Sequence, residues 1–239
     1  PVTGMGFIER ADIAADGHVE VDFRLPTYWC SPNFAFLMLE DVRSALDALS
    51  WVPAYRITLH DHMFADEVNT GISEGRSFAE IFDTLAEKVD LEGLREKFRL
   101  KAFKRRQEAV ILDLKAVGIA DSEIVRMTLA MFDAMVPGTD QVRLRMARYR
   151  QALLQRWPDL GPLDIAIVDY DGNHITRDAL SAHLADLRSV RINMEFNGAL
   201  CRGLKHTRYK EMDVVDGEPT LVDFIMNRVP APEARPSST

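Results

Sequence analysis

Between residues 7 and 60 the spacing of apolar residues changes twice, and this constrains the fold more than any other feature of the chain. In His18 to Leu25 the apolar residues fall at every second position, which is typical of a strand with one buried face. Phe7 to Ile13 has the composition of a second strand, and the sequence Ala-Ala-Asp-Gly between the two predicts a hairpin turn.

The spacing then becomes helical and afterwards returns to that of a strand. Ser31 and Pro32 offer a helix cap and a first-turn proline, and the apolar residues from Phe34 to Leu46 follow helical spacing. Trp51 to His60 reads as a third strand. The pattern therefore predicts a small β-β-α-β domain and an α+β fold class.

Helical patterns dominate the next part of the chain. Ser77 and Glu80 form a capping box, and a long charged helix is expected over Leu91 to Val117, ending at Gly118. A third helix is expected from a cap at Asp121 or Ser122 to Pro137-Gly138. A fourth, arginine-rich helix should run to Trp157-Pro158. Together these helices predict a bundle appended to the first domain.

The last third returns to mixed structure. We expect a strand over Asp164 to Asp169, a turn at Asp171-Gly172-Asn173 and a helix over Arg177 to Arg188. The final residues are rich in proline, alanine and serine, which is typical of a disordered tail. The expected layout is an α+β domain over 1–72, a helical region over 73–160, a mixed α/β region over 161–228 and a tail over 229–239.

Composition excludes several classes of function. The chain has 239 residues and a net charge of -8, so nonspecific nucleic-acid binding is not expected. Its longest strongly apolar run, Phe34 to Leu39, is far shorter than the roughly 20 residues of a membrane span. No Gly-rich phosphate loop is present, so no nucleotide cofactor is expected. Two cysteines are too few for a disulfide framework, which favours a reducing, cytoplasmic location.

Cys30 is the strongest candidate for a chemical role. It lies in a loop directly before a predicted helix, with Thr27 and Ser31 beside it. Unpaired N–H groups at a helix N-terminus favour the thiolate, the form that binds soft metals. The alternative is a small buried cysteine packed under Trp29. Since a cluster usually needs four protein ligands, Cys30 would act by transient transfer, across a homodimer or with a partner's ligands.

Two further groups are candidate metal ligands. If the third strand continues through His60-Asp61-His62, both imidazoles lie on one face and could bind iron or zinc with a nearby carboxylate. The alternative is a polar strand end entering a solvated loop. Cys201 and His206 form a secondary candidate site, but five positions is a poor helical spacing, and Gly198 and Gly203 indicate a loop or a close backbone approach there. The alternative is ordinary packing and surface chemistry.

The phrases Pro1-Val-Thr-Gly4 and Leu25-Pro-Thr-Tyr-Trp-Cys30, with the order of elements, resemble a known family. This is the iron–sulfur-assembly domain found in SufT, in PaaD and at the N-terminus of Mrp-type ATPases. Glu40 to Leu46 and Val52 to Leu59 continue the similarity, which covers about the first 70 residues. Ser31 departs from the family pattern, because proline usually follows the cysteine.

The resemblance implies a role in maturing iron–sulfur or related metalloproteins, with Cys30 as the functional thiol. We therefore expect a non-enzymatic accessory protein that binds iron or a labile iron–sulfur cluster transiently. Its partner would be a client metalloenzyme or another assembly protein. Two alternatives remain open at this point: a non-catalytic interaction or folding accessory of a multicomponent diiron monooxygenase, and a metal-dependent enzyme using His60 and His62.

Overall fold

The computed structural model describes residues 5–83 and 90–209, and the chain is mixed α+β, as the sequence predicts. The described residues form two compact units, one of residues 5–83 with 198–209 and the other of residues 90–197. This division joins residues 161–197 to the helical region, whereas the sequence analysis separated them at residue 160. The phrase Pro1-Val-Thr-Gly4 and the expected tail over 229–239 lie outside the described residues.

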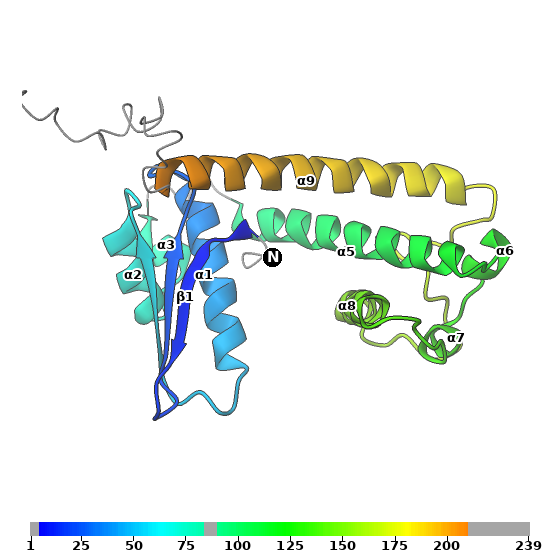
Figure 1. Ribbon diagram of the computed structural model, residues 1–239, viewed down its shortest axis with the longest axis horizontal. Coiled ribbons are helices and arrows are strands. Elements are labelled where there is room, and N and C mark those ends of the chain that lie inside the picture. The colour runs from blue at the N-terminus through cyan, green and yellow to red at the C-terminus, as the bar shows by residue number, and fades with distance from the viewer. Residues whose placement is uncertain (1–4, 84–89, 210–239) are drawn as a thin grey trace, which may run out of the picture. The chain divides into compact units, whose positions relative to one another are not determined.

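The first unit is a three-stranded sheet with helices packed beside it (Figure 1). Its strands follow the order β1-β2-β3, with β1 and β2 antiparallel and β2 and β3 parallel. The elements from the first strand onward are β1 (Ile8–Ile13), β2 (Val19–Arg24), α1 (Pro32–Asp47), β3 (Tyr55–His60), α2 (Ala65–Ser73) and α3 (Phe78–Ile81). The predicted β-β-α-β order of the first four elements is confirmed.

The core of this unit lies between the sheet and α1. Alternate residues of β2 are buried, and α1 turns a continuous apolar face to them, as expected from the two periodicities. The predicted capping box is present, because Ser77 Oγ accepts from the Glu80 N–H and Glu80 accepts from the Ser77 N–H. The buried residues include Val19, Val21, Phe23, Leu25, Phe36, Leu39, Ile57, Leu59, Val68 and Ile72.

The second unit is helical. Its elements are α5 (Leu91–Ala116), α6 (Asp121–Ile124), α7 (Leu129–Asp133), α8 (Asp140–Arg156) and the first part of α9 (Leu180–Tyr209). The predicted long helix ends where expected, since Gly118 adopts φ +88°, a conformation that glycine reaches without strain. The core of this unit gathers around Phe103, Tyr149 and Ile167.

Two predictions for this unit are wrong. The single helix expected up to Pro137 is two short helices, because Met127 accepts a hydrogen bond from the Ala166 N–H and the Leu129 N–H donates to Asp164, both at 2.8 Å. These bonds hold residues 127–129 in a non-helical path. The segment Asp164 to Asp169 forms only isolated bridges, Thr128 to Ile165 and Val168 to His174, so it is not a strand of a sheet.

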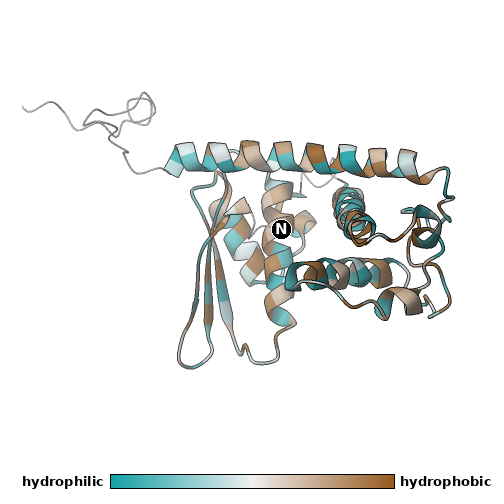
Figure 2. Ribbon diagram, turned by 45° about the vertical axis from the view of Figure 1, so that its right-hand side comes forward, coloured by the Kyte–Doolittle hydropathy of each residue, from teal (hydrophilic) through white to brown (hydrophobic). Residues whose placement is uncertain are grey.

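The last helix is far longer than expected. It was predicted to end at Arg188, with a loop near Gly198 and Gly203, yet α9 continues unbroken to Tyr209 (Figures 1 and 2). Each glycine costs a helix only about 1 kcal/mol. Packing offsets that cost, since Leu187 is fully buried in the helical unit and Lys205 and Arg208 bind the sheet unit.

Candidate functional site around Cys30

Cys30 lies in the loop between β2 and α1 and keeps part of its surface exposed. Ser31 is the cap residue of α1 but makes no side-chain capping bond, and Pro32 follows at the first helical turn. The Cys30 sulfur shares a 3.1 Å hydrogen bond with Thr27 Oγ1. The structure therefore brings together the three loop residues singled out from sequence, with the thiol at the N-terminal end of a helix.

His62 holds the backbone of the Cys30 loop in place through a hydrogen bond. The Phe64 N–H donates to His62 Nδ1 at 3.2 Å, so the proton of the neutral ring lies on Nε2, which donates to the Cys30 carbonyl at 2.7 Å. The side chain is only 4% exposed, and this burial lowers the pKa of His62 below its ordinary value. Both ring nitrogens are occupied, so His62 positions Cys30 and has no nitrogen left over for a metal.

The expected shared face of His60 and His62 does not form. β3 ends at His60, and Asp61 turns the chain with φ +52°, a left-handed conformation that is rare outside glycine. His60 stays on the outer face of the sheet, where its Nε2 lies 2.9 Å from Asp22 Oδ1. The hydrogen bond from His60 is the main cause that keeps the pKa of Asp22 below its usual range, and the hydrogen bond from Arg10 is the next largest. The two rings therefore serve different partners.

Cys201 comes to the same region on α9. Burial raises the pKa of the Cys201 thiol, and the neighbouring Cys30 thiol raises it further. The same helix face, at steps of four and three residues, carries Lys205, which binds the Gly6 carbonyl and pairs with Glu9 at 3.1 Å, and Arg208, which donates to the Asp61 carbonyl at 2.8 Å. These anchors hold Cys201 within electrostatic reach of Cys30.

His206 does not join this site. Five residues separate it from Cys201, which turns it to a different side of the helix, and it is exposed. The predicted Cys201–His206 pairing is therefore not supported by the helix geometry. Sequence reasoning missed the nearness of Cys201 to Cys30 because the glycines suggested a loop, and no local pattern relates residues 171 positions apart.

Large apolar side chains surround Cys30 on the surface. Trp29 is 71% exposed, Tyr28 49%, Met63 44% and Phe34 40%. They come from three separate segments, and the Met63 N–H donates to the Tyr28 carbonyl at 2.9 Å, which joins two of them. Exposed apolar clusters of this kind mark contact sites for other molecules. The alternative reading, a small cysteine buried under Trp29, is wrong, since both residues reach the surface.

The candidate metal ligands of this site are its two thiols, Cys30 and Cys201. Residues 5–83 and 90–209 contain no group of three or more His, Cys, Asp or Glu side chains placed to hold one metal ion. Thiolates are the donors that iron–sulfur clusters use, so Cys30 and Cys201 are the side chains of this region that would bind such a group, and the remaining ligands would come from elsewhere.

No protein-family model matches the chain, and neither the curated proteins nor the solved structures contain a significant match. The similarity to the iron–sulfur-assembly domain therefore rests on the residues quoted for it and on the β-β-α-β order. Among the described residues, no helix combines the length and the apolar character that crossing a bilayer requires.

Proposed function

We propose that this protein is an accessory factor that assembles or inserts iron or an iron–sulfur cluster into a client metalloenzyme, with Cys30 as its functional thiol. The observation that carries this proposal is a partly exposed free thiol, Cys30, next to the exposed apolar side chains Tyr28 and Trp29, with the free thiol Cys201 within electrostatic reach. A partly exposed thiol can accept and release a metal, while the surrounding apolar side chains can bind a client.

In this proposal, different residues bind the metal, hold the loop and contact the client. Cys30 and Cys201 would hold iron or a cluster, which supplies the electron-transfer or catalytic group that the client needs. His62 keeps the Cys30 loop in place through its hydrogen bond to the Cys30 carbonyl. Trp29 and Tyr28 would contact the client. Because each chain offers two thiols, a homodimer would supply the four thiol ligands that a cluster usually needs.

The test is anaerobic reconstitution of the purified chain with ferrous iron and sulfide, followed by iron and sulfide analysis and absorption spectra. We expect absorbance from an iron–sulfur species in the natural chain and its loss in Cys30→Ala. Cys201→Ala should weaken retention of iron. Ser73→Ala, an exposed change elsewhere in the same unit, is the matched control and should load normally. Equal loading of Cys30→Ala and the natural chain would contradict the proposal.

A second candidate function is favoured by the exposed Trp29 and Tyr28. In that case the protein is a folding or interaction accessory of a diiron monooxygenase, and Cys30 plays no chemical part. The two proposals differ in one outcome. Under the second, Cys30→Ala leaves the client's metal content unchanged while Trp29→Ala weakens client binding. Under the first, Cys30→Ala lowers the client's metal content.

A further inference from the structure

One side of β3 faces no other strand, because β3 lies at the edge of the sheet. The Val19 N–H of β2 donates to the Ala54 carbonyl at 3.0 Å. Backbone groups of alternate residues face the same neighbour in a parallel ladder, so Ala54, Arg56 and Thr58 face β2. Tyr55, Ile57 and Leu59 therefore turn their N–H and C=O groups to the open side.

Among the described residues, hydrogen-bond partners are found for the open-side backbone groups at the Leu59 end of this edge only. The side chain of Asn69 in α2 pairs with the backbone of Leu59 as a neighbouring strand would. Its Oδ1 accepts from the Leu59 N–H at 2.7 Å, and its Nδ2 donates to the Leu59 carbonyl at 3.0 Å. The hydrogen bonds found within residues 5–83 and 90–209 include none to the open-side groups of Tyr55 or Ile57. Such groups are a template for an added strand.

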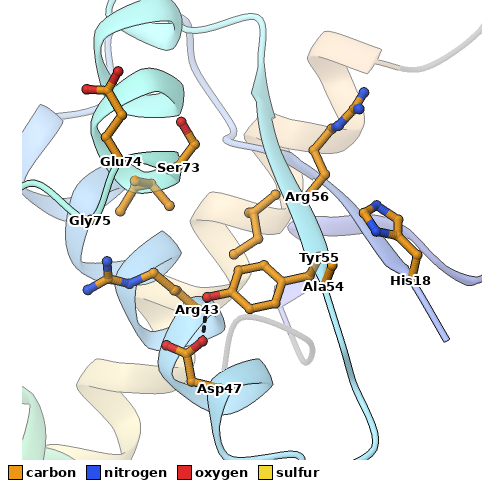
Figure 3. Close-up of a pocket in the computed structure, with 11 residues that line it drawn as sticks. His18, Arg43, Asp47, Ala54, Tyr55, Arg56, Ser73, Glu74 and Gly75 are labelled. Atoms are coloured by element: carbon orange, nitrogen blue, oxygen red, sulfur yellow. Dashed lines mark hydrogen bonds between the residues drawn. The ribbon is translucent and has the colours of Figure 1, made fainter.

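A cavity of about 650 Å³ lies beside these unpaired groups, a volume within the range of ligand-binding pockets. Figure 3 shows the Tyr55 ring and Arg43 in this cavity, with Ser73, Glu74 and Gly75 at the end of α2 on its far side. Space therefore exists next to the open edge.

Arg43 supplies a positive charge that the cavity does not neutralise. Its Nε is buried without a hydrogen-bond partner, and its ion pair with Glu40 is long, with Oε1 3.9 Å from Nη2. The two acidic side chains that line the cavity are engaged: Asp47 accepts from the Tyr55 hydroxyl at 2.5 Å, and Glu74 pairs with Arg76 at 2.8 Å. An incoming carboxylate would thus meet a partly exposed guanidinium whose ion pair is long.

We propose that the open edge of β3 binds an extended acidic peptide segment of a partner protein by strand addition. The backbone of that segment pairs with Tyr55 and Ile57, and one of its Asp or Glu side chains reaches Arg43. A single peptide fits this edge better than the sheet of a second copy, because Asn69 closes the edge at Leu59 and leaves only a short stretch open. The proposal is independent of Cys30 and of metal handling.

The test uses the full chain and a short synthetic peptide of alternating valine and glutamate, followed by amide NMR and hydrogen exchange. Without peptide, the Tyr55 and Ile57 amides should exchange rapidly compared with those of Arg56 and Thr58. With peptide, both should shift and become protected. The same peptide with lysine in place of glutamate should bind about tenfold more weakly, the effect of losing one charge-assisted hydrogen bond.

Variants locate the binding on this edge. Arg43→Gln should weaken the glutamate peptide about tenfold and leave the lysine peptide no weaker than before. Ser73→Phe fills the cavity from an exposed helix position, so it should abolish binding without unfolding the unit. Arg10→Gln on β1 is the control and should bind normally. Protection of Tyr55 and Ile57 in the peptide-free chain, or binding that both Arg43→Gln and Ser73→Phe leave intact, would overturn the proposal.

Discussion

The two units treat their polar and reactive groups in opposite ways. In the helical unit, the buried Gln107 side chain donates to Tyr149 and to the Val168 carbonyl, and the Tyr149 hydroxyl donates to Ala166. The buried Glu108 pairs with Arg191 at 2.9 Å. In the sheet unit, two free thiols and Trp29 reach the surface, and part of the β3 edge has no partner within residues 5–83 and 90–209.

This difference indicates that the helical unit is mainly structural and that the sheet unit is the one suited to bind other molecules. A closed network of buried hydrogen bonds stabilises one arrangement and leaves little to offer a ligand. Exposed apolar side chains and unpaired strand groups cost stability unless a partner covers them. The comparison therefore predicts that substitutions in the helical unit mainly change stability, and that substitutions around Cys30 mainly change binding.

The largest expected effect is that of Tyr149→Ala. The ring is fully buried and packs at 5.5 Å from Phe103 and 5.9 Å from Phe132, so its removal should cost about 3–5 kcal/mol of unfolding free energy. Trp29→Ala, in contrast, should change stability by less than about 0.5 kcal/mol, because the ring is exposed. Denaturant unfolding of both variants checks the comparison. Equal losses of stability would break it.

A smaller effect is expected from His62→Ala in the sheet unit. Loss of the buried hydrogen bond to Cys30 should cost about 1–3 kcal/mol and loosen the loop, so the Cys30 thiol should be alkylated faster. His60→Ala removes an imidazole of the outer sheet face and serves as the control. If His60→Ala accelerated Cys30 alkylation as much as His62→Ala, the positioning role of His62 would be wrong.

Acid should weaken both units through their histidines. Burial is the main cause that lowers the pKa of His62 and of His183. At His62 the hydrogen bond to the Cys30 carbonyl and the charge of Glu67 oppose this lowering, and Arg208 adds to it. The unfolded chain then binds more protons than the folded one below pH of about 6.5. Stability is full above that pH and falls as the pH drops toward the lowered folded pKa values. Urea unfolding at several pH values should show a shallower loss in His62→Gln and in His183→Gln than in the natural chain.

A small stability effect is also expected at Cys201. Cys201→Ala removes a half-buried sulfur from α9 and should cost less than about 1 kcal/mol. Its alkylation should be slower than that of Cys30, since burial and the Cys30 thiol raise its pKa. Mass spectrometry of timed iodoacetamide reactions measures both rates. Faster alkylation of Cys201 than of Cys30 would contradict the arrangement of the two thiols.

Local patterns predicted the elements well but not the contacts between distant segments. Alternation in Val19 to Arg24, the cap before Phe78 and Gly118 each determine structure within a few residues, and the structure agrees with them. The path of Met127 to Leu129 depends on hydrogen bonds to Asp164 and Ala166, which no local pattern reveals. The low helix propensity of Gly198 and Gly203 gave a wrong prediction, because packing along α9 outweighs the cost of glycine in a helix.

The candidate site shows the same division. Sequence context placed Cys30, Thr27 and Ser31 in one loop ahead of a helix, and the structure agrees. The turn at Asp61 sends His60 and His62 to different partners, and a single residue in a left-handed conformation decides this. Cys201 reaches Cys30 only because α9 docks on the sheet unit through Lys205 and Arg208.

The most direct test of the central proposal asks whether iron protects Cys30. The chain is reconstituted anaerobically with ferrous iron and sulfide, treated briefly with iodoacetamide, and the modification of each cysteine is measured by mass spectrometry. If Cys30 holds the metal, its alkylation should slow markedly in the loaded chain, and removal of the iron with a chelator should restore the original rate. Equal alkylation of Cys30 with and without bound iron would contradict a role for this thiol in metal handling.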